Sequence, residues 1–162
     1  MGNHTVTTLH LPRWSELPNL DLYLDQLVTI LEKNLKDFIC NKDDTIITKT
    51  MINNYVKQGL IKPPKKKKYS RLHIATLTVI CILKQIYNIS DINELIMLAI
   101  KTAKFNSAYD QFCEAIEKAI LYTFDGVEYV IPENLPYEHS LLKSVAQSFA
   151  SKLYVEKTFL HK

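Results

Sequence analysis

Glycine is scarce in the 162-residue sequence, which contains only Gly2, Gly59 and Gly126. Long flexible linkers and phosphate-cradling loops depend on glycine, because it adopts backbone conformations that other residues avoid. The sequence therefore argues against a P-loop or a dinucleotide-binding fingerprint. With 47% hydrophobic residues, the chain is long enough for one ordinary core and short for two, which predicts a single compact domain with an appendage.

Long apolar runs are also missing. No stretch approaches the roughly 20 apolar residues of a membrane-spanning helix, and the N-terminus lacks the pattern of a signal peptide. Position six, where a myristoylation motif requires Ser or Thr, is Val6. We therefore expect a soluble, cytoplasmic protein that does not bind a membrane.

Residues for catalysis or metal binding do not form recognisable patterns. Cys40, Cys81 and Cys113 are odd in number and widely spaced, which predicts reduced core thiols rather than a disulfide framework or zinc site. No histidine pair has metal-ligand spacing. Paired carboxylates and nucleophile motifs are lacking too. We therefore expect a protein that is not an enzyme and that has no metal site and no cofactor.

Acidic residues are absent between positions 45 and 90, whereas the same segment holds nine of the 20 lysines and arginines. The other 11 basic residues are outnumbered by the 17 acidic residues, all of which lie outside this segment. Such segregation is typical of a polyanion-binding module on a neutral or acidic body, whereas a merely solvated surface usually mixes both signs.

Hydrophobic periodicity predicts an all-α, mainly helical fold. Residues 1–20 contain Pro12 and Pro18 and read as an extended arm. The predicted helices follow the arm. The first runs from a cap at Asn19 or Asp21 to Ile39, and the others cover about 49–58, 71–87, 91–104, 107–124 and 137–157, with Thr48, Ser70 and Ser90 as N-caps.

The second predicted helix has two unlike faces. Ile52, Tyr55 and Val56 form an apolar face, and Gly59 is placed to end the helix in the left-handed conformation. The opposite face carries amide, hydroxyl and lysine groups and no acid. Pro63 and Pro64 then enforce an extended connection that leads to four consecutive lysines.

The order of these elements resembles the winged-helix DNA-binding domain of MerR-type regulators. In the stretch "TKTMINNYVKQGLI", the residues that match that family's recognition helix are Thr48, Ile52, Asn53, Tyr55, Lys57, Gly59, Leu60 and Ile61. "KYSRLHIATLTVI" resembles the join between that family's wing and its next helix. The resemblance implies a winged helix-turn-helix domain over 21–104, with 105–162 as a C-terminal helical region for dimerisation or effector binding.

A second resemblance covers roughly the first hundred residues. The motifs "LPRW", "MINNYVK" and "KKKYSR", in this order, are similar to an uncharacterised bacterial family, domain-of-unknown-function family 1836. This resemblance carries no activity with it. The sequence departs from the MerR pattern in a longer connection after Ile39 and a shorter segment between Ile61 and Tyr69.

Candidate DNA-binding residues follow from the charge pattern and the MerR resemblance. Loop lysines neutralise phosphates without reading sequence, asparagines can bond an adenine edge, and lysines reach guanine acceptors. Simple solvation explains Asn53 and Asn54 equally well when they are taken alone. His73 lies one helical turn from Tyr69, and we expect it to face DNA or solvent. The predicted site consists of Lys49, Thr50, Asn53, Asn54, Lys57, Lys62, Lys65, Lys66, Lys67, Lys68, Tyr69 and Arg71.

The function that the sequence favours is a DNA-binding transcriptional regulator, which acts as a homodimer because one small module makes few contacts to DNA. The alternative is a protein-interaction module whose basic loop binds an acidic partner or an anionic surface. RNA binding is a third option, and catalysis is the last. Nothing in the sequence names a DNA target or decides whether an effector exists.

Overall fold

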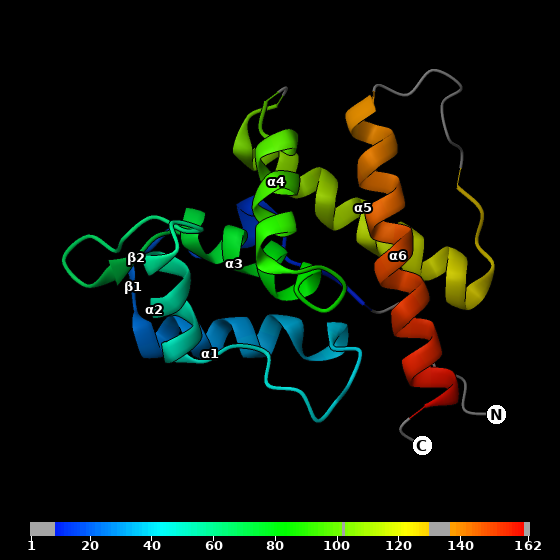
Figure 1. Cartoon of the computed structure of the whole chain (residues 1–162), viewed down its shortest axis with the longest axis horizontal. Helices are drawn as coiled ribbons and strands as arrows, with labels where there is room; N and C mark the ends of the chain where they lie inside the picture. The colour runs from blue at the N-terminus through cyan, green and yellow to red at the C-terminus, as the bar shows by residue number, and fades with distance from the viewer. Residues whose placement is uncertain (1–8, 102, 130–136, 161–162) are drawn as a thin grey trace.

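The computed structural model describes residues 9–101, 103–129 and 137–160 (Figure 1). These residues form six α-helices and one two-stranded antiparallel sheet, so the fold is mainly α as predicted. The helices are α1 (Leu24–Leu35), α2 (Lys49–Lys57), α3 (Arg71–Leu83), α4 (Ile89–Ala99), α5 (Phe105–Asp125) and α6 (Tyr137–Phe159). No helix in the described part of the chain is long and apolar enough to cross a membrane.

Helix α3 lies at the centre of the structure. Its sequence is apolar on nearly all sides, and nine of its 13 residues are buried, among them Leu77, Ile80 and Cys81 with no exposed surface. An all-round apolar helix is stable only where other elements cover every side. Figure 1 shows α3 between the end that carries α2 and the sheet and the end that carries α5 and α6.

The first helix starts later than the sequence predicted. Leu22–Tyr23 is strand β1, which pairs with β2 (Lys68–Tyr69) in the register Leu22 to Tyr69 and Tyr23 to Lys68. The predicted caps Asn19 and Asp21 are therefore wrong, because the extended strand occupies the residues that would form the first helical turn. Helix α1 begins at Leu24, where Gln26 Oε1 accepts the Tyr23 N–H at 2.9 Å. It ends at Leu35 and is followed by the 3₁₀ turn η3 (Lys36–Phe38).

The boundaries of α3 and α4 also differ from the prediction. Helix α3 ends at Leu83 rather than Tyr87, in a region where Gln85 fastens the chain by donating to Phe38 O and Cys81 O. The cap of α4 is Asn88, not Ser90, because Asn88 Oδ1 accepts the Asp91 N–H at 2.9 Å. Helix α4 therefore starts at Ile89, ahead of the predicted position, and ends at Ala99.

The arm that precedes β1 lies along α5. Within it, Trp14–Glu16 forms the 3₁₀ turn η2, and Leu11 and Leu17 are buried in the common core. The Trp14 N–H donates to Asp110 at 2.7 Å, the Tyr109 hydroxyl donates to Pro12 O at 2.6 Å, and Arg13 forms an ion pair with Glu117. Side chains of α5 thus satisfy backbone groups of a segment whose regular structure is limited to one 3₁₀ turn.

All three cysteines are reduced and buried, as the sequence predicted. Burial disfavours the thiolate and raises the pKa of Cys40 to about 11 and the pKa of both Cys81 and Cys113 to about 12. These thiols stay protonated at neutral pH and act as small core side chains.

We predict that Leu77→Ala lowers the free energy of unfolding by about 2–5 kcal/mol, because it leaves a cavity in the fully buried face of α3. Urea denaturation followed by circular dichroism measures this change. The matched control is Leu20→Ala, since Leu20 is 69% exposed and should change stability by no more than about 0.5 kcal/mol. Equal losses in the two variants would contradict the central position of α3.

Candidate nucleic-acid interface

The outer face of α2 presents five of the predicted site residues. Thr48 caps the helix, accepting the Met51 N–H at 3.1 Å, and Ile52 and Tyr55 are buried on the inner side. The exposed residues of the outer face are Lys49, Thr50, Asn53, Asn54 and Lys57. The predicted cap, face and helix are confirmed, and the helix carries no acidic residue.

Gly59 ends this helix and directs the chain toward the lysines. Its φ of +74° lies in the left-handed region, which allows the Leu60 N–H to return to Tyr55 O at 2.9 Å. Ile61 is buried directly after this turn. The connection from α2 is therefore short and anchored in the core.

The lysine run folds into a tight turn, and we call residues 62–69 the basic hairpin. Lys65 and Lys68 exchange two backbone hydrogen bonds of 3.1 and 2.9 Å, and Lys66 and Lys67 occupy the turn between them. Their φ angles are 53° and 63°, as in a type I′ turn. Such turns favour Asn and Gly, because other side chains clash with the backbone in this conformation.

Strand β2 continues the hairpin and joins it to the rest of the protein. Pairing with β1 brings Lys68 beside Tyr23, with the Lys68 ammonium 5.2 Å from the centre of the Tyr23 ring. The ring face attracts the cation and favours this position of the side chain. Lys62, Lys65, Lys66 and Lys67 remain exposed.

His73 fastens both ends of the basic hairpin to α3. Its Nδ1 accepts the Ser70 N–H at 3.0 Å, and its Nε2 donates to Lys62 O at 2.8 Å. The ring also packs edge-on against Tyr69, with the centroids 5.1 Å apart. The imidazole is therefore held as the neutral Nε2–H tautomer.

The structure corrects the expectation that His73 faces DNA or solvent, because only 8% of the residue is exposed. His73 comes three positions after Ser70, which is the spacing of a capping pair, and this was the one signal that pointed inward. The long-range bond to Lys62 had no counterpart in the local sequence pattern.

Two predicted site residues, Tyr69 and Arg71, lie behind the exposed lysines. Tyr69 is only 4% exposed, so its ring anchors the hairpin, and burial raises the pKa of its phenol. The Arg71 guanidinium lies 5.3 Å from the centre of the Trp14 ring and is partly buried there. The predicted contacts of these two side chains with DNA stay predictions.

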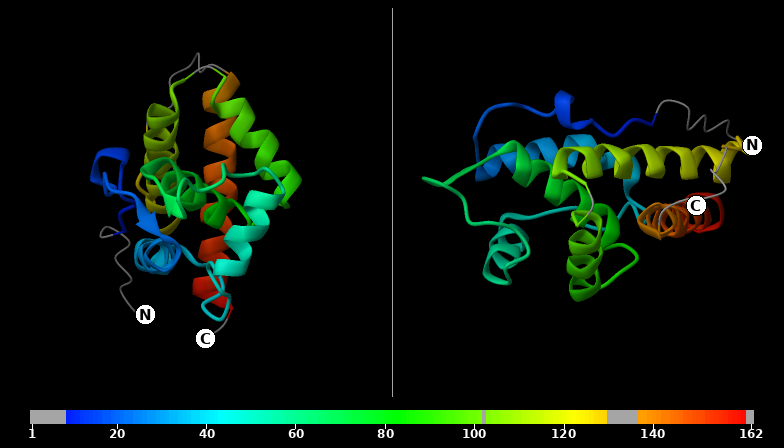
Figure 2. Two further views of the ribbon diagram at one scale, coloured as in Figure 1. Left: turned by 90° about the vertical axis from the view of Figure 1, so that its left-hand side faces the viewer. Right: turned by 90° about the horizontal axis from the view of Figure 1, so that it is seen from above.

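The outer face of α2 and the basic hairpin lie at the same end of the molecule. Figure 1 and the right-hand view in Figure 2 place them away from α6, and the short segment 58–61 links them in the chain. Among the described residues, the ion pairs join Arg13 and Lys118 to glutamates, and none uses a lysine of residues 49–68. Within the described part of the chain, no ion pair with a carboxylate therefore neutralises the positive charge at this end.

Comparison with known proteins places the chain in a family. The family described as "Domain of unknown function (DUF1836)" matches residues 12–112. The chain belongs to this family. The DUF1836 region includes the arm from Pro12, both strands, α1 to α4 and the first part of α5, and therefore the whole basic end. No curated protein and no solved structure shows significant similarity to the chain.

Metal-ligating side chains do not cluster in the described residues of this DUF1836 protein. Within residues 9–101, 103–129 and 137–160, no three His, Cys, Asp or Glu side chains lie where they could hold one metal ion. The prediction that the protein is not an enzyme stays a prediction.

We predict that Lys67→Gly raises the free energy of unfolding by roughly 0.5–1 kcal/mol. Glycine removes the strain of about 1–2 kcal/mol that a left-handed backbone imposes on a lysine. Glycine also makes the unfolded chain more flexible, which stabilises the unfolded state by about 0.5–1 kcal/mol and leaves a smaller net gain. Lys65→Gly is the control, because its φ is ordinary and the same substitution should lower stability. Chemical denaturation of both variants measures the effect, and a loss of stability in Lys67→Gly would contradict the turn geometry.

Proposed function

We propose that this protein is a DNA-binding transcriptional regulator with a MerR-like winged helix-turn-helix. In this proposal α2 is the recognition helix that enters the major groove, and the basic hairpin is the wing that grips the phosphate backbone. The order α1, α2, hairpin and α3 supports the assignment, as does the antiparallel pairing of β2 with β1.

The observation that carries the proposal is the placement of lysines at the tip of the hairpin. Lys66 and Lys67 both adopt positive φ, where glycine or asparagine would stabilise the turn better. Strained backbone conformations are concentrated at functional sites, and this one presents two charged side chains to solvent. The exposed, acid-free face of α2 lies at the same end, as a second surface for the same duplex.

The exposed residues divide into two proposed roles. Lys62, Lys65, Lys66 and Lys67 neutralise phosphates and supply affinity that depends on salt and not on sequence. Asn53 and Asn54 bond base edges, with Lys49 or Lys57 reaching guanine or a phosphate, and these contacts supply specificity. Tyr69, Arg71 and His73 hold the wing in place from behind.

The connection between α1 and α2 separates this protein from ordinary MerR-type domains, which join these helices by a turn of a few residues. Here the 3₁₀ turn η3 and residues 39–48 lie between α1 and α2. We therefore expect the angle at which α2 meets the groove to differ from the angle in MerR-type domains.

We also propose a cytoplasmic homodimer, because two recognition helices reading a pseudo-palindrome supply specificity that one module lacks. Helices α5 and α6 pack against each other and leave apolar residues exposed at one end, namely Val155, Phe159 and Leu160. This apolar end is the proposed dimer contact.

The second candidate is a module that binds an acidic protein partner or an anionic surface through the same lysines. The lysine run favours it, because charge alone does not require a duplex. Fluorescence anisotropy with a random duplex, a single strand of equal charge and heparin, from about 50 to 200 mM salt, separates the two candidates. The regulator prefers the duplex, whereas the alternative module follows total charge.

We predict that changing Lys65, Lys66, Lys67 and Lys68 together to Ala weakens binding to all duplexes alike. The slope of log affinity against log salt should flatten by about 0.9 for each phosphate that the variant no longer neutralises. The charge-matched control changes four exposed lysines elsewhere, which are Lys33, Lys36, Lys101 and Lys104. If both variants bind duplexes equally weakly, the effect follows from net charge alone, and the basic hairpin does not act as a wing.

We predict that Asn53→Ala lowers discrimination between a selected DNA site and a random duplex by about 1–3 kcal/mol, while nonspecific affinity stays nearly constant. Selection from a random duplex library provides the site. Asn93→Ala is the control, since Asn93 is an exposed amide on α4. If Asn53→Ala weakens both duplexes equally, or lowers the helical content seen by circular dichroism, Asn53 is not a reading residue.

A further inference from the structure

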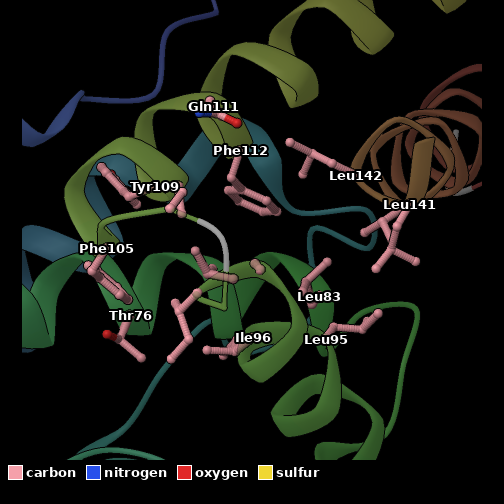
Figure 3. Close-up of a pocket in the computed structure, with 16 residues that line it drawn as sticks. Thr76, Leu83, Leu95, Ile96, Phe105, Tyr109, Gln111, Phe112, Leu141 and Leu142 are labelled. Atoms are coloured by element: carbon pink, nitrogen blue, oxygen red, sulfur yellow. The ribbon is translucent and has the colours of Figure 1, made fainter. Parts of the chain in front are cut away.

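A cavity of about 410 Å³ lies among α3, α4, α5 and α6, away from the basic end (Figure 3). Each helix contributes apolar side chains to its wall, including Val79 from α3, Leu95 and Ile96 from α4, Phe112 from α5, and Leu142 and Val145 from α6. The space reaches the protein surface, because Ile100 in its wall is 37% exposed, so a small molecule can enter it. Its volume is that of a small-molecule site.

Among the described residues, the wall carries no charged side chain. Both of its hydroxyl groups donate inside the protein, the Thr76 hydroxyl to Leu72 O at 2.8 Å and the Tyr109 hydroxyl to Pro12 O at 2.6 Å. The Gln111 amide donates to Ser107 Oγ at 3.2 Å. A charged ligand would lose its hydration without gaining a partner, whereas an apolar ligand would replace water at an apolar surface.

Helix α4 leaves this space open because it is only partly packed. Ile92 is its single fully buried residue, Leu95 and Ile96 are partly exposed, and Met97 is 51% exposed. Apolar side chains on the inner side of α4 therefore lack the close partners that core residues normally have. A ligand between α4 and α5 would supply these missing contacts.

We propose that this cavity binds an uncharged, largely apolar small molecule about the size of three aromatic rings. An apolar void of roughly 150 Å³ is enough to hold benzene, so the present cavity admits a larger molecule. A partner helix would need an elongated groove, whereas here side chains of four helices converge on one space (Figure 3). The proposal does not depend on DNA binding.

The test is a fluorescence titration of the full chain with N-phenyl-1-naphthylamine, an uncharged probe that consists of one naphthalene and one phenyl group. We expect saturable binding of one probe per chain. The same molecule with an 8-sulfonate group is the charged comparison, and we expect it to bind at least about tenfold more weakly, because the cavity wall holds no cation. Non-saturable binding, or equal affinity for the two probes, would overturn the proposal.

A pair of variants locates the site. Ala108 lines the cavity from α5, so Ala108→Phe should fill the cavity and lower the affinity for the uncharged probe at least about tenfold. Met97→Phe adds an aromatic ring on the exposed side of α4, outside the cavity wall, and should retain the affinity of the unmodified chain. Unchanged affinity in a folded Ala108→Phe variant would contradict the assignment.

Methyl NMR of the unmodified chain gives a result that does not depend on the folding of any variant. On addition of the uncharged probe, we expect the methyl signals of Val79, Ile96 and Leu142 to shift. The methyl signals of Leu31 and Ile47, which are buried outside the cavity wall, should stay in place. Shifts confined to residues outside the cavity would overturn the proposal.

Discussion

The candidate interface depends on the hydrogen bonds of one buried imidazole. His73 bridges the Lys62 carbonyl and the Ser70 amide, which are the two points where the basic hairpin leaves and rejoins the core. Without this bridge, a loop of mutually repelling lysines would have little reason to keep one conformation. Tyr69 packs on the same ring and pairs with Leu22, so the base of the hairpin, the sheet and α3 form one rigid support.

This support extends to the far side of the molecule through the N-terminal arm. Arg71, in the first turn of α3, lies over Trp14, and Trp14 packs against Phe105 at the start of α5. Arg13, next to Trp14, pairs with Glu117 further along α5. The arm thus links the basic end to the C-terminal helices, which carry one wall of the cavity. Both proposed surfaces are attached to α3, which is the element that the fold buries most completely.

Local sequence patterns predicted those parts of the fold that local forces determine. Thr48 and Gly59 delimit α2 because a cap and a left-handed stop act within one helical turn, and the all-round apolarity of α3 predicted its burial. Long-range pairing was not visible in this way: Leu22–Tyr23 reads as the start of a helix until β2 lies beside it. The inward position of His73 depends on Lys62, 11 residues away, and the cavity depends on four helices from distant parts of the chain.

The most direct test of the central claim is an amide NMR titration of the protein with a short random DNA duplex at about 50 mM salt. We expect the amide signals of the outer face of α2 and of residues 62–68 to shift, while the amide signals of α5 and α6 remain unchanged. Shifts that are absent from α2, or that are strongest in the C-terminal helices, would contradict the claim that the basic end of this protein is where it holds DNA.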